Sequence, residues 1–507
     1  MMGPRQDRHS KLFYAGVSIE ERLDPNHPLR KILAAVDFAF VRQQVAPLYG
    51  ARGNPSLDPT LVLKLLFLLF YENVASEREL LRQLPCRLDW LWFLSMDLDS
   101  AIPDHSVLSK ARRRWGSKVF TGFFKKVLGQ CVRAGLVDGA KVHIDGSLID
   151  AHADQGKLTL ALEFTGETLY GQLEAAEERG ATGTAATPTT AATAATAATS
   201  APAAIPAPAS AATLASLAAP AGTDSSPGAD TAVPHSPPPG TLYSPTDPEA
   251  RLTRKYGRCV LGYKDHRVVD DRCGIITATI TTAASVAESS MLESVMDQHE
   301  SNTGLTILEP TADKGYGTVD NYCMLRGRRC VPVIPHPLVR EDKTKFPRSV
   351  FIYDSAQDVY RCPAGQLLHR RGGVTEGRYR YQTKAGVCES CPMRAGCTTS
   401  SKTRLLSRQV HQDAIEWADS RLSPGQRKAR MRRRKIRAEG SFADSANHHG
   451  YKRARWRGGE KMTIQNLLIA TAQNLRKLLR VSPRIRGEGA GRSPQHAVGL
   501  MFPWALP

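Results

Sequence analysis

Cysteine is scarce in this sequence, with 10 among 507 residues, which is too few for the disulfide scaffold of a small secreted domain. Long hydrophobic runs are missing too. The longest, residues 61–71, contains Lys64 and is too short to cross a bilayer. The first residues lack the apolar stretch of a signal peptide. From these absences we expect a cytoplasmic protein with no membrane partner.

Acidic residues are outnumbered as well. There are 49 Asp and Glu against 68 Lys and Arg, which gives a formal net charge of +19 and a pI near 9.6. So large a positive excess favours a polyanionic partner, nucleic acid before an acidic membrane surface. No phosphate-binding loop of the GxxxxGK type occurs, so a nucleoside triphosphate is not the expected substrate.

Residues 1–138 have the pattern of a helical domain. Asp58 followed by Pro59 is typical of a helix start, and the leucine-rich run after it predicts a buried helix. Asp104 is a candidate cap for a helix with four basic residues, Lys110, Arg112, Arg113 and Arg114. A short helix pair before a basic helix is the outline of a helix-turn-helix DNA reader. An ordinary charged, solvated helix face fits equally well.

Two stretches lack the large apolar residues that a folded core needs. Residues 181–240 consist almost wholly of Ala, Thr, Pro, Ser and Gly, so little apolar surface is available to offset the entropy of ordering. We predict a disordered low-complexity insertion there. The tail at 481–507, rich in Gly, Arg and Pro, is also expected to be disordered.

Asp145 lies in a segment, residues 141–150, that we interpret as a strand. If the β-branched residues of this segment face a core, alternation with period two places His143 and Asp145 on the opposite face, with Gly146 ending the strand. Asp followed by Gly is also common in tight turns, which is the alternative interpretation. The importance of Asp145 therefore depends on whether the chain supplies it with partners.

A second acid occupies a similar setting. The segment 255–266 and the β-branched run at 275–281 are expected to form a three-stranded meander with the first strand. A strand is then predicted at 305–308, and Asp313 follows it shortly before a Gly. Two carboxylates are thus expected just beyond, or at the end of, strands of one sheet.

A third acid, Glu439, is isolated within a basic helix. It stands at helical spacing with apolar residues, namely Ile436, Ala443 and Ala446. That spacing predicts that its side chain lies on the face that meets the fold, and an ion pair with Lys435 is the alternative. The segment that follows mixes cations with aromatic rings, as surfaces for nucleic acid do. Its candidate DNA contacts are Lys452, Arg453, Arg455 and Arg457.

Four cysteines gather between residues 341 and 400. They are Cys362, Cys388, Cys391 and Cys397. Two of them are separated by two residues, as in a zinc knuckle, and four thiolates can complete a tetrahedral site. We predict a small insertion with structural zinc, and unpaired structural thiols are the alternative. With four protein ligands no position is open for water, so no catalysis is expected at this metal.

Three carboxylates from two strands and one late helix suggest a site for two hard metal ions. Oxygen ligands suit Mg²⁺. Two such ions about 3.5–4 Å apart activate the attacking oxygen and stabilise the leaving oxygen in an in-line displacement at phosphorus. The positive charge of the protein would attract the phosphates of DNA as the substrate.

Several short motifs accompany these acids. They are His143-Ile144-Asp145-Gly146-Ser147, Gly262-Tyr263-Lys264, Ala312-Asp313-Lys314-Gly315-Tyr316-Gly317, Ala438-Glu439-Gly440-Ser441-Phe442, Arg453-Ala454-Arg455-Trp456-Arg457-Gly458 and Gln473-Asn474-Leu475-Arg476-Lys477-Leu478. In combination they resemble the motifs of bacterial insertion-sequence transposases of the DDE class. The most similar subgroup has a long helical N-terminal domain with a Pro-Asp-His-Ser segment, as at 103–106, and an inserted cysteine cluster.

The resemblance implies an α/β protein with a ribonuclease-H-like core, a mixed sheet with flanking helices. Asp145, Asp313 and Glu439 match the three metal-binding acids in order, and two Mg²⁺ or Mn²⁺ ions are implied as cofactors. The core would comprise residues 139–180, 241–340 and 401–480. Lys264 and His266 join the candidate DNA contacts. The implied partners are the terminal inverted repeats and the target DNA, bound by a homodimer at the nucleoid.

The implied function is metal-dependent cleavage at the element ends followed by strand transfer. One position departs from the family, which commonly has a lysine seven residues after the glutamate. This chain has Ala446 there, so Lys452 or Arg453 would have to substitute. A DNA-binding relative without catalysis is therefore one alternative. A nuclease that never joins strands is another, and it would use the same residues.

Overall fold

The computed structural model describes residues 18–50, 55–160, 241–255, 257–336, 344–398 and 403–488, with Met2, Arg52 and Ser400 besides; side-chain environments are described as far as residue 480. The low-complexity insertion predicted at 181–240 lies outside the described residues. So do positions 161–180 of the first core segment and 489–507 of the predicted tail.

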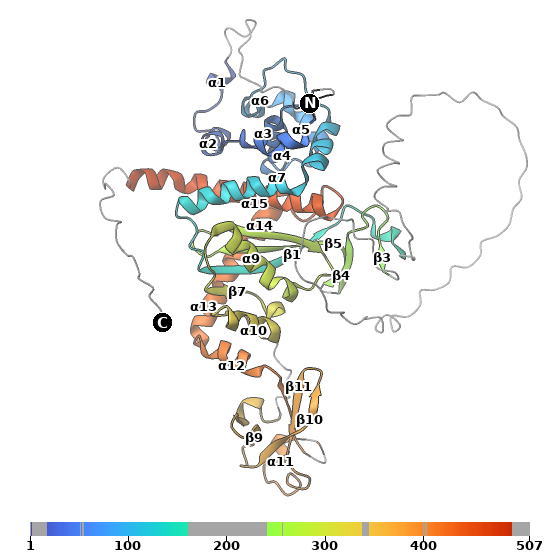
Figure 1. The fold of residues 1–507 in the computed structure, drawn as a ribbon, viewed down its shortest axis with the longest axis vertical. Coiled ribbons are helices and arrows are strands. Elements are labelled where there is room, and N and C mark those ends of the chain that lie inside the picture. The colour runs from blue at the N-terminus through green and yellow to red at the C-terminus, as the bar shows by residue number, and fades with distance from the viewer. Residues whose placement is uncertain are drawn as a thin grey trace, which may run out of the picture. The chain divides into compact units, whose positions relative to one another are not determined.

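The N-terminal region is helical, as predicted (Figure 1). Its helices are α1 (Ile19–Arg22), α2 (Pro28–Ala35), α3 (Phe40–Val45), α4 (Pro59–Tyr71), α5 (Glu77–Gln83), α6 (Leu88–Leu94) and α7 (His105–Arg133), with 3₁₀ turns η2 (Ala46–Leu48) and η3 (Leu84–Cys86). The Asp58 carboxylate caps α4 by accepting a hydrogen bond from the Thr60 amide, and all but one residue of α4 is buried. Asp104 caps α7, which is kinked at Gly116, where φ is +59°.

One mixed sheet organises the next part of the chain. Its strands are β1 (Lys141–Asp150), β4 (Arg251–Lys255), β5 (Arg258–Asp270), β6 (Ile276–Ala283) and β7 (Glu309–Thr311). β5 pairs antiparallel with both β1 and β6, which confirms the predicted meander, and β7 lies parallel to β1 on its other edge. A parallel bridge from Thr311 to Val333 extends the sheet by one further position. The short strands β2 (Thr159–Leu160) and β3 (Leu242–Tyr243) precede and follow the undescribed insertion.

Two predictions for these strands need correction. β1 does not end at Gly146 but continues to Asp150, because β5 supplies a pairing partner along its whole length. The predicted strand at 305–308 is displaced to β7, whose register with β1 begins at Glu309. Pro310 is tolerated inside β7, since its carbonyl still accepts a hydrogen bond from the Val333 amide.

Helices flank this sheet. They are α9 (Leu292–Thr303) after the 3₁₀ turn η5 (Glu288–Met291), α10 (Val319–Gly327) after η6 (Lys314–Tyr316), α12 (Gln412–Ser420), α13 (Pro424–Arg434), the π-helical turn η8 (Lys435–Glu439), α14 (Gly440–His449) and α15 (Gly459–Glu488). α15 contacts α4, α7 and β6. Its apolar side joins the N-terminal helices and one face of the sheet in a single hydrophobic core. α15 runs to Glu488 and so extends into the first residues of the predicted tail.

The cysteine-containing segment has a sheet and a core of its own. Its strands are β8 (Ile352–Asp354), β9 (Val359–Arg361), β10 (Leu367–Thr375), β11 (Arg378–Gln382) and β12 (Leu405–Gln409), preceded by the turn η7 (Arg348–Val350), with the short helix α11 (Arg394–Cys397) between the last two. Buried aromatic and aliphatic residues, including Phe351, Tyr360 and Tyr381, form its core. The pairing of β12 with β11 carries this sheet past the boundary predicted at residue 400.

Candidate active site

The register of two parallel strands brings Asp145 and Asp313 together. His143 of β1 is paired with Thr311 of β7, and each aspartate lies two residues further along its chain. The two carboxylates therefore project from neighbouring positions on the same side of the sheet. Each accepts a hydrogen bond from a nearby glycine amide, Asp145 from Gly146 at 3.0 Å and Asp313 from Gly315 at 2.8 Å. Asp145 lies within β1 rather than at its end, whereas Asp313 lies just beyond β7.

The environment of Asp145 disfavours its negative charge. Burial raises the pKa of Asp145 to about 6, and the nearby carboxylates of Asp313 and Glu288 act in the same direction. The Arg434 guanidinium opposes them. Its Nη1 lies 3.2 Å from Asp145 Oδ2, and the two side chains are only 9% and 14% exposed. A cation from helix α13 thus compensates the acids.

Glu439 is not on the helix face that we predicted. Its side chain is exposed, and Ile436 is 65% exposed, whereas Arg434 and Ala438 are buried. The cause is the π-helical turn η8, which spans Lys435–Glu439 and shifts the helix face relative to regular α-helical spacing. Among the described residues Glu439 forms no hydrogen bond or ion pair, so the alternative pairing with Lys435 is absent too.

Glu288 instead stands beside the two aspartates, although the sequence did not single it out. It opens the 3₁₀ turn η5 after β6. Burial, and next the Asp313 carboxylate, raise the pKa of Glu288. Gly146 and Gly315 leave space for it: a Cβ on Gly146 would lie 3.2 Å from Glu288 Cδ, and one on Gly315 would lie 3.7 Å from its Oε2. The glycines that follow both aspartates are the only sequence signal that room is needed here.

The chemistry of these side chains suits a hard divalent cation. Carboxylate oxygens are the donors that Mg²⁺ and Mn²⁺ prefer, and the acids share a partly buried location with one compensating guanidinium. As the side chains stand, no three His, Cys, Asp or Glu residues in the described part of the chain are close enough to form a metal-binding group. Binding of an ion would therefore require the acids to move closer together.

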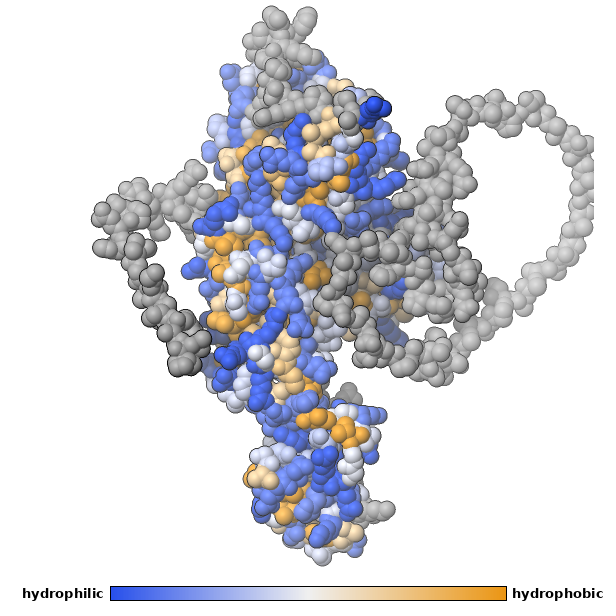
Figure 2. Space-filling view, in the orientation of Figure 1, coloured by the Kyte–Doolittle hydropathy of each residue, from blue (hydrophilic) through white to orange (hydrophobic). Residues whose placement is uncertain are grey.

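The predicted DNA contacts divide by exposure. On the face shown in Figure 2, hydrophilic side chains predominate. Six of the predicted contacts are exposed, namely Lys110, Arg113, Arg114, Lys452, Arg453 and Arg457. Lys264 and Arg455 are half-buried. Two others are turned inward: Arg112 is buried, paired with Glu77 and stacked 4.0 Å from the Trp456 ring, and His266 is buried against Thr282. Their burial removes Arg112 and His266 from the surface available to DNA.

Lys452 is one of the two cations expected to substitute for the lysine that is missing at Ala446. Its Nζ donates to Ser147 Oγ at 2.9 Å, and Ser147 is two residues from Asp145 on β1. The pKa of Lys452 is lowered, first by burial, while Asp150 and Asp145 act against that shift. Lys452 therefore supplies positive charge beside the acids from the loop between α14 and α15.

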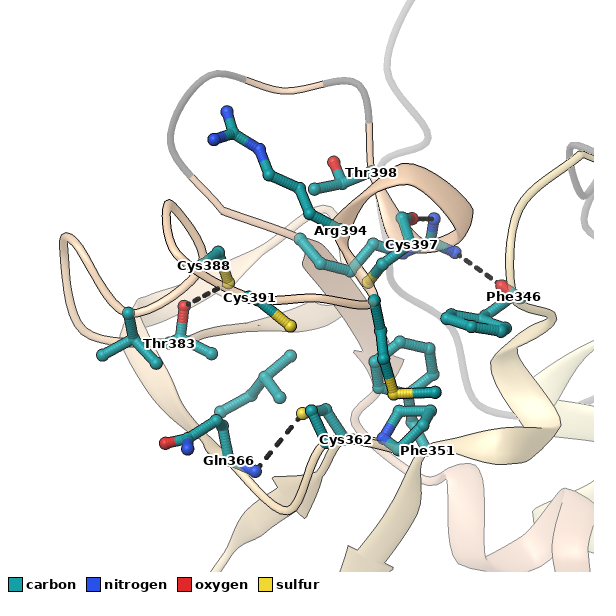
Figure 3. A pocket seen from close by; sticks show the side chains of 16 residues that line it. Phe346, Phe351, Cys362, Gln366, Thr383, Cys388, Cys391, Arg394, Cys397 and Thr398 are labelled. Atoms are coloured by element: carbon teal, nitrogen blue, oxygen red, sulfur yellow. Dashed lines mark hydrogen bonds between the residues drawn. The ribbon is translucent and has the colours of Figure 1, made fainter.

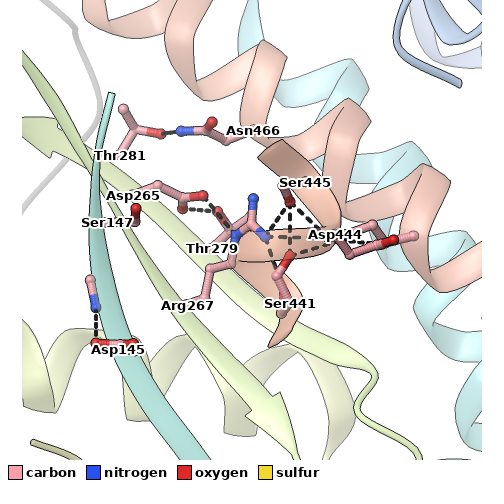
Figure 4. A network of polar contacts seen from close by, with 12 residues as sticks. Asp145, Ser147, Asp265, Arg267, Thr279, Thr281, Ser441, Asp444, Ser445 and Asn466 are labelled. Atoms are coloured by element: carbon pink, nitrogen blue, oxygen red, sulfur yellow. Dashed lines mark hydrogen bonds and ion pairs between the residues drawn. The ribbon is translucent and has the colours of Figure 1, made fainter. Parts of the chain in front are cut away.

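A buried polar network fixes α14 on the sheet (Figure 4). Arg267 of β5 is fully buried; its Nε donates to Asp265 at 2.7 Å and its Nη1 donates to Ser445 at 2.8 Å and to Ser441 at 3.2 Å. Thr279 of β6 donates to the other oxygen of Asp265 at 2.6 Å. Because α14 begins directly after Glu439, this network determines where η8 meets the sheet.

The four cysteines converge on one small cavity of about 30 Å³ (Figure 3). Cys362 accepts a hydrogen bond from the Gln366 amide, and Cys388 contacts the Thr383 hydroxyl at 3.2 Å. Burial raises the pKa of the Cys397 thiol, and the three other cysteines add to that shift. The predicted ligands are therefore neighbours, although not at metal-ligand spacing as they stand.

Two family models match the chain. One is described as a transposase domain (DUF772) and matches residues 17–114; the other is a transposase DDE domain and matches residues 361–479. No curated protein and no solved structure matches the chain. The described residues contain no helix with the length and apolar character needed to cross a bilayer.

The matched DDE domain implies a ribonuclease-H-like fold, and the mixed sheet that carries Asp145 agrees with that class of protein. The two matches support a DDE-class transposase of insertion-sequence type, and such domains indicate a function in DNA transposition. The DDE match includes Glu439 and all four clustered cysteines, whereas Asp145 and Asp313 precede it.

Proposed function

We propose that this transposase cleaves phosphodiester bonds at the ends of its own element and joins the freed 3′ hydroxyl to target DNA. The observation that carries the proposal is the register of β1 and β7, which sets Asp145 beside Asp313. The two carboxylates create a negative field. Among the ion pairs that the described residues form, only the one between Arg434 and Asp145 compensates this field. Such a field would attract divalent cations.

Asp145 and Asp313 would hold Mg²⁺ or Mn²⁺, with Glu439 as the third acid that the family resemblance implies. When bound, two such ions lower the barrier by stabilising the attacking and leaving oxygens at phosphorus. For Glu439 to take part, the π-helical turn η8 would have to shift so that its side chain turns toward Asp145. Lys452 is placed to bind a DNA phosphate beside the acids. Arg434 would release Asp145 when a metal binds.

DNA is the proposed partner, in the form of terminal inverted repeats and target DNA. The exposed cations of α7, Lys110, Arg113 and Arg114, and those after α14 support this assignment. A homodimer on DNA would bring both element ends together, in the cytoplasm at the nucleoid.

We also propose structural Zn²⁺ for the four cysteines, because tetrahedral zinc prefers such a thiolate set.

The function is tested by cleavage of a labelled element end with Mg²⁺, using wild type, Asp313→Asn and the exposed control Asp320→Asn. We expect the Asp313 variant to cut roughly a hundredfold more slowly or worse, because several kcal/mol of charge stabilisation are lost. The control should cut like the wild type. Equal cutting by wild type and Asp313→Asn would overturn the proposal.

The two alternatives give different outcomes in the same assay. The exposed position of Glu439 and the missing lysine at Ala446 favour a DNA-binding relative without catalysis. In that case wild type would bind the element ends and leave them uncut. A plain nuclease would cut them but form no product joined to a target plasmid.

A further inference from the structure

Glu288 is an acid that lies near two other carboxylates and has no pairing partner of its own. In the described part of the chain it forms no hydrogen bond or ion pair. The nearest lysine on β5, Lys264, donates its ammonium proton to the Val286 carbonyl at 2.6 Å instead. Half-buried acids are usually paired. Glu288 thus has no directly paired cation in its half-buried location.

A buried hydroxyl points to the same place. Tyr316 of η6 is fully buried, and its hydroxyl has no hydrogen-bond partner within the described residues. It interacts electrostatically with Glu288, Asp145 and Asp313 together. A polar group that is buried and unsatisfied beside three carboxylates indicates a position where a ligand or its water shell belongs.

The backbone makes space for Glu288 at this position. Gly146 follows Asp145, and Gly315 lies two residues after Asp313. A Cβ at the first would stand 3.3 Å from Glu288 Oε1, and a Cβ at the second only 3.0 Å from Asp313 Oδ1. Side chains at these glycines would crowd the gap between the acids. The two glycines therefore allow the Glu288 carboxylate to approach both aspartates.

We propose that Glu288 is a direct ligand of the divalent cation held by Asp145 and Asp313. The folded chain would then supply three oxygen donors before η8 moves, and Glu439 would complete the site only after DNA binds. This inference rests on the proposed metal site. Repulsion holds the carboxylates apart without a cation, and the flexible Glu288 side chain would close the remaining distance when one binds.

The test measures Mn²⁺ binding to the full-length protein without DNA, from the electron paramagnetic resonance signal of free Mn²⁺. The variants are Glu288→Gln, Asp313→Asn and an exposed control, Glu293→Gln. We expect Glu288→Gln to raise the Kd for Mn²⁺ at least tenfold, and Glu288→Asp to restore part of the affinity. Glu293→Gln should bind like the wild type. Thermal unfolding verifies that each variant is folded.

The outcomes separate this inference from the proposed function. If Glu288→Gln binds Mn²⁺ as tightly as wild type while Asp313→Asn does not, the inference is overturned and the aspartate site stands. If Asp313→Asn also binds like wild type, or wild type binds no Mn²⁺, both the inference and the proposed function fail.

Without metal, Glu288→Gln should also unfold at the same or a higher temperature than wild type, because a repulsive charge is gone. A clear loss of stability would show a structural role and would contradict the proposal.

Discussion

Arg434 acts at this site as a built-in counter-ion. Its guanidinium pairs with Asp145 at 3.2 Å and also opposes the negative field at Glu288 and Tyr316. A divalent cation at the same carboxylates would be repelled by it. Arg434 should therefore stabilise the metal-free protein and weaken metal binding.

Replacing Arg434 by Gln tests this dual effect. Without metal, the variant should lose a few kcal/mol of stability, because the partly buried acids keep their desolvation cost without a partner. With Mg²⁺ its melting temperature should rise more than that of wild type. Thermal unfolding across a Mg²⁺ titration measures both effects.

The neighbouring Arg433 provides the matched control. Its side chain is 50% exposed and pairs with Asp271 rather than with the acid cluster. Arg433→Gln should change the free energy of unfolding by no more than about 0.5 kcal/mol. Its response to Mg²⁺ should equal that of wild type. If Arg434→Gln behaved like this control, the counter-ion role would be wrong.

The sequence predicts single positions well where local periodicity decides them. Asp145 and Asp313 were identifiable because strand alternation and a following glycine are local features. Glu288 was not, since only the long-range pairing of β1 with β5 and β7 brings η5 to the acids. The face of Glu439 was predicted wrongly because one π-helical turn changes the helical spacing.

At the scale of elements, the Arg267 network is the main attachment of α14 to the sheet. Arg267→Met would leave Asp265 buried without its cation, and breaking such a pair costs about 3–5 kcal/mol. Ser441→Ala removes one neutral partner and should cost about 1 kcal/mol. Urea unfolding of both variants compares the two losses. Equal losses would mean that the ion pair has no special role.

The cysteine-containing sheet gives a second prediction at this scale. Purified protein should contain one Zn²⁺ per chain, and Cys391→Ala should lose it, because three thiolates bind zinc less tightly than four. Hydrogen exchange should then accelerate in β8–β12 and stay unchanged in the central sheet. Cys259→Ala, at an exposed cysteine outside the cluster, is the control. Metal-free wild type with slow exchange in β8–β12 would contradict the zinc site.

At the scale of the whole molecule, α14 and α15 connect the N-terminal helices to the sheet. The His449 Nδ1 at the end of α14 donates to the Phe70 carbonyl of α4 at 2.7 Å, and α15 fills the shared core. Apolar residues recur at helical spacing from Met462 to Leu475, which indicates a helix with one buried face but does not indicate that this face packs on α4 and α7. Such contacts depend on residues several hundred positions apart, which local periodicity does not encode.

His449 makes this connection sensitive to pH. Burial lowers the pKa of His449 to about 4, so the folded protein keeps it neutral while the unfolded chain gains a proton below about pH 6.5. The unfolded state then binds more protons, and the contribution of His449 to stability, complete above pH 6.5, is lost as the pH falls toward 4. At pH 5 this loss is about 2 kcal/mol.

The variant His449→Gln removes the titrating group but keeps an amide that can donate to Phe70. It should be less stable than wild type at pH 7.5, and the difference should shrink by up to about 2 kcal/mol at pH 5. Acids with a raised pKa, such as Asp247 at about 6, make the folded protein more stable as the pH falls, which is opposite to the effect of His449. Because wild type and variant share these acids, their effect cancels in the difference. Urea unfolding at both pH values measures the difference in free energy of unfolding between wild type and His449→Gln. An equal difference at pH 7.5 and pH 5 would refute the prediction.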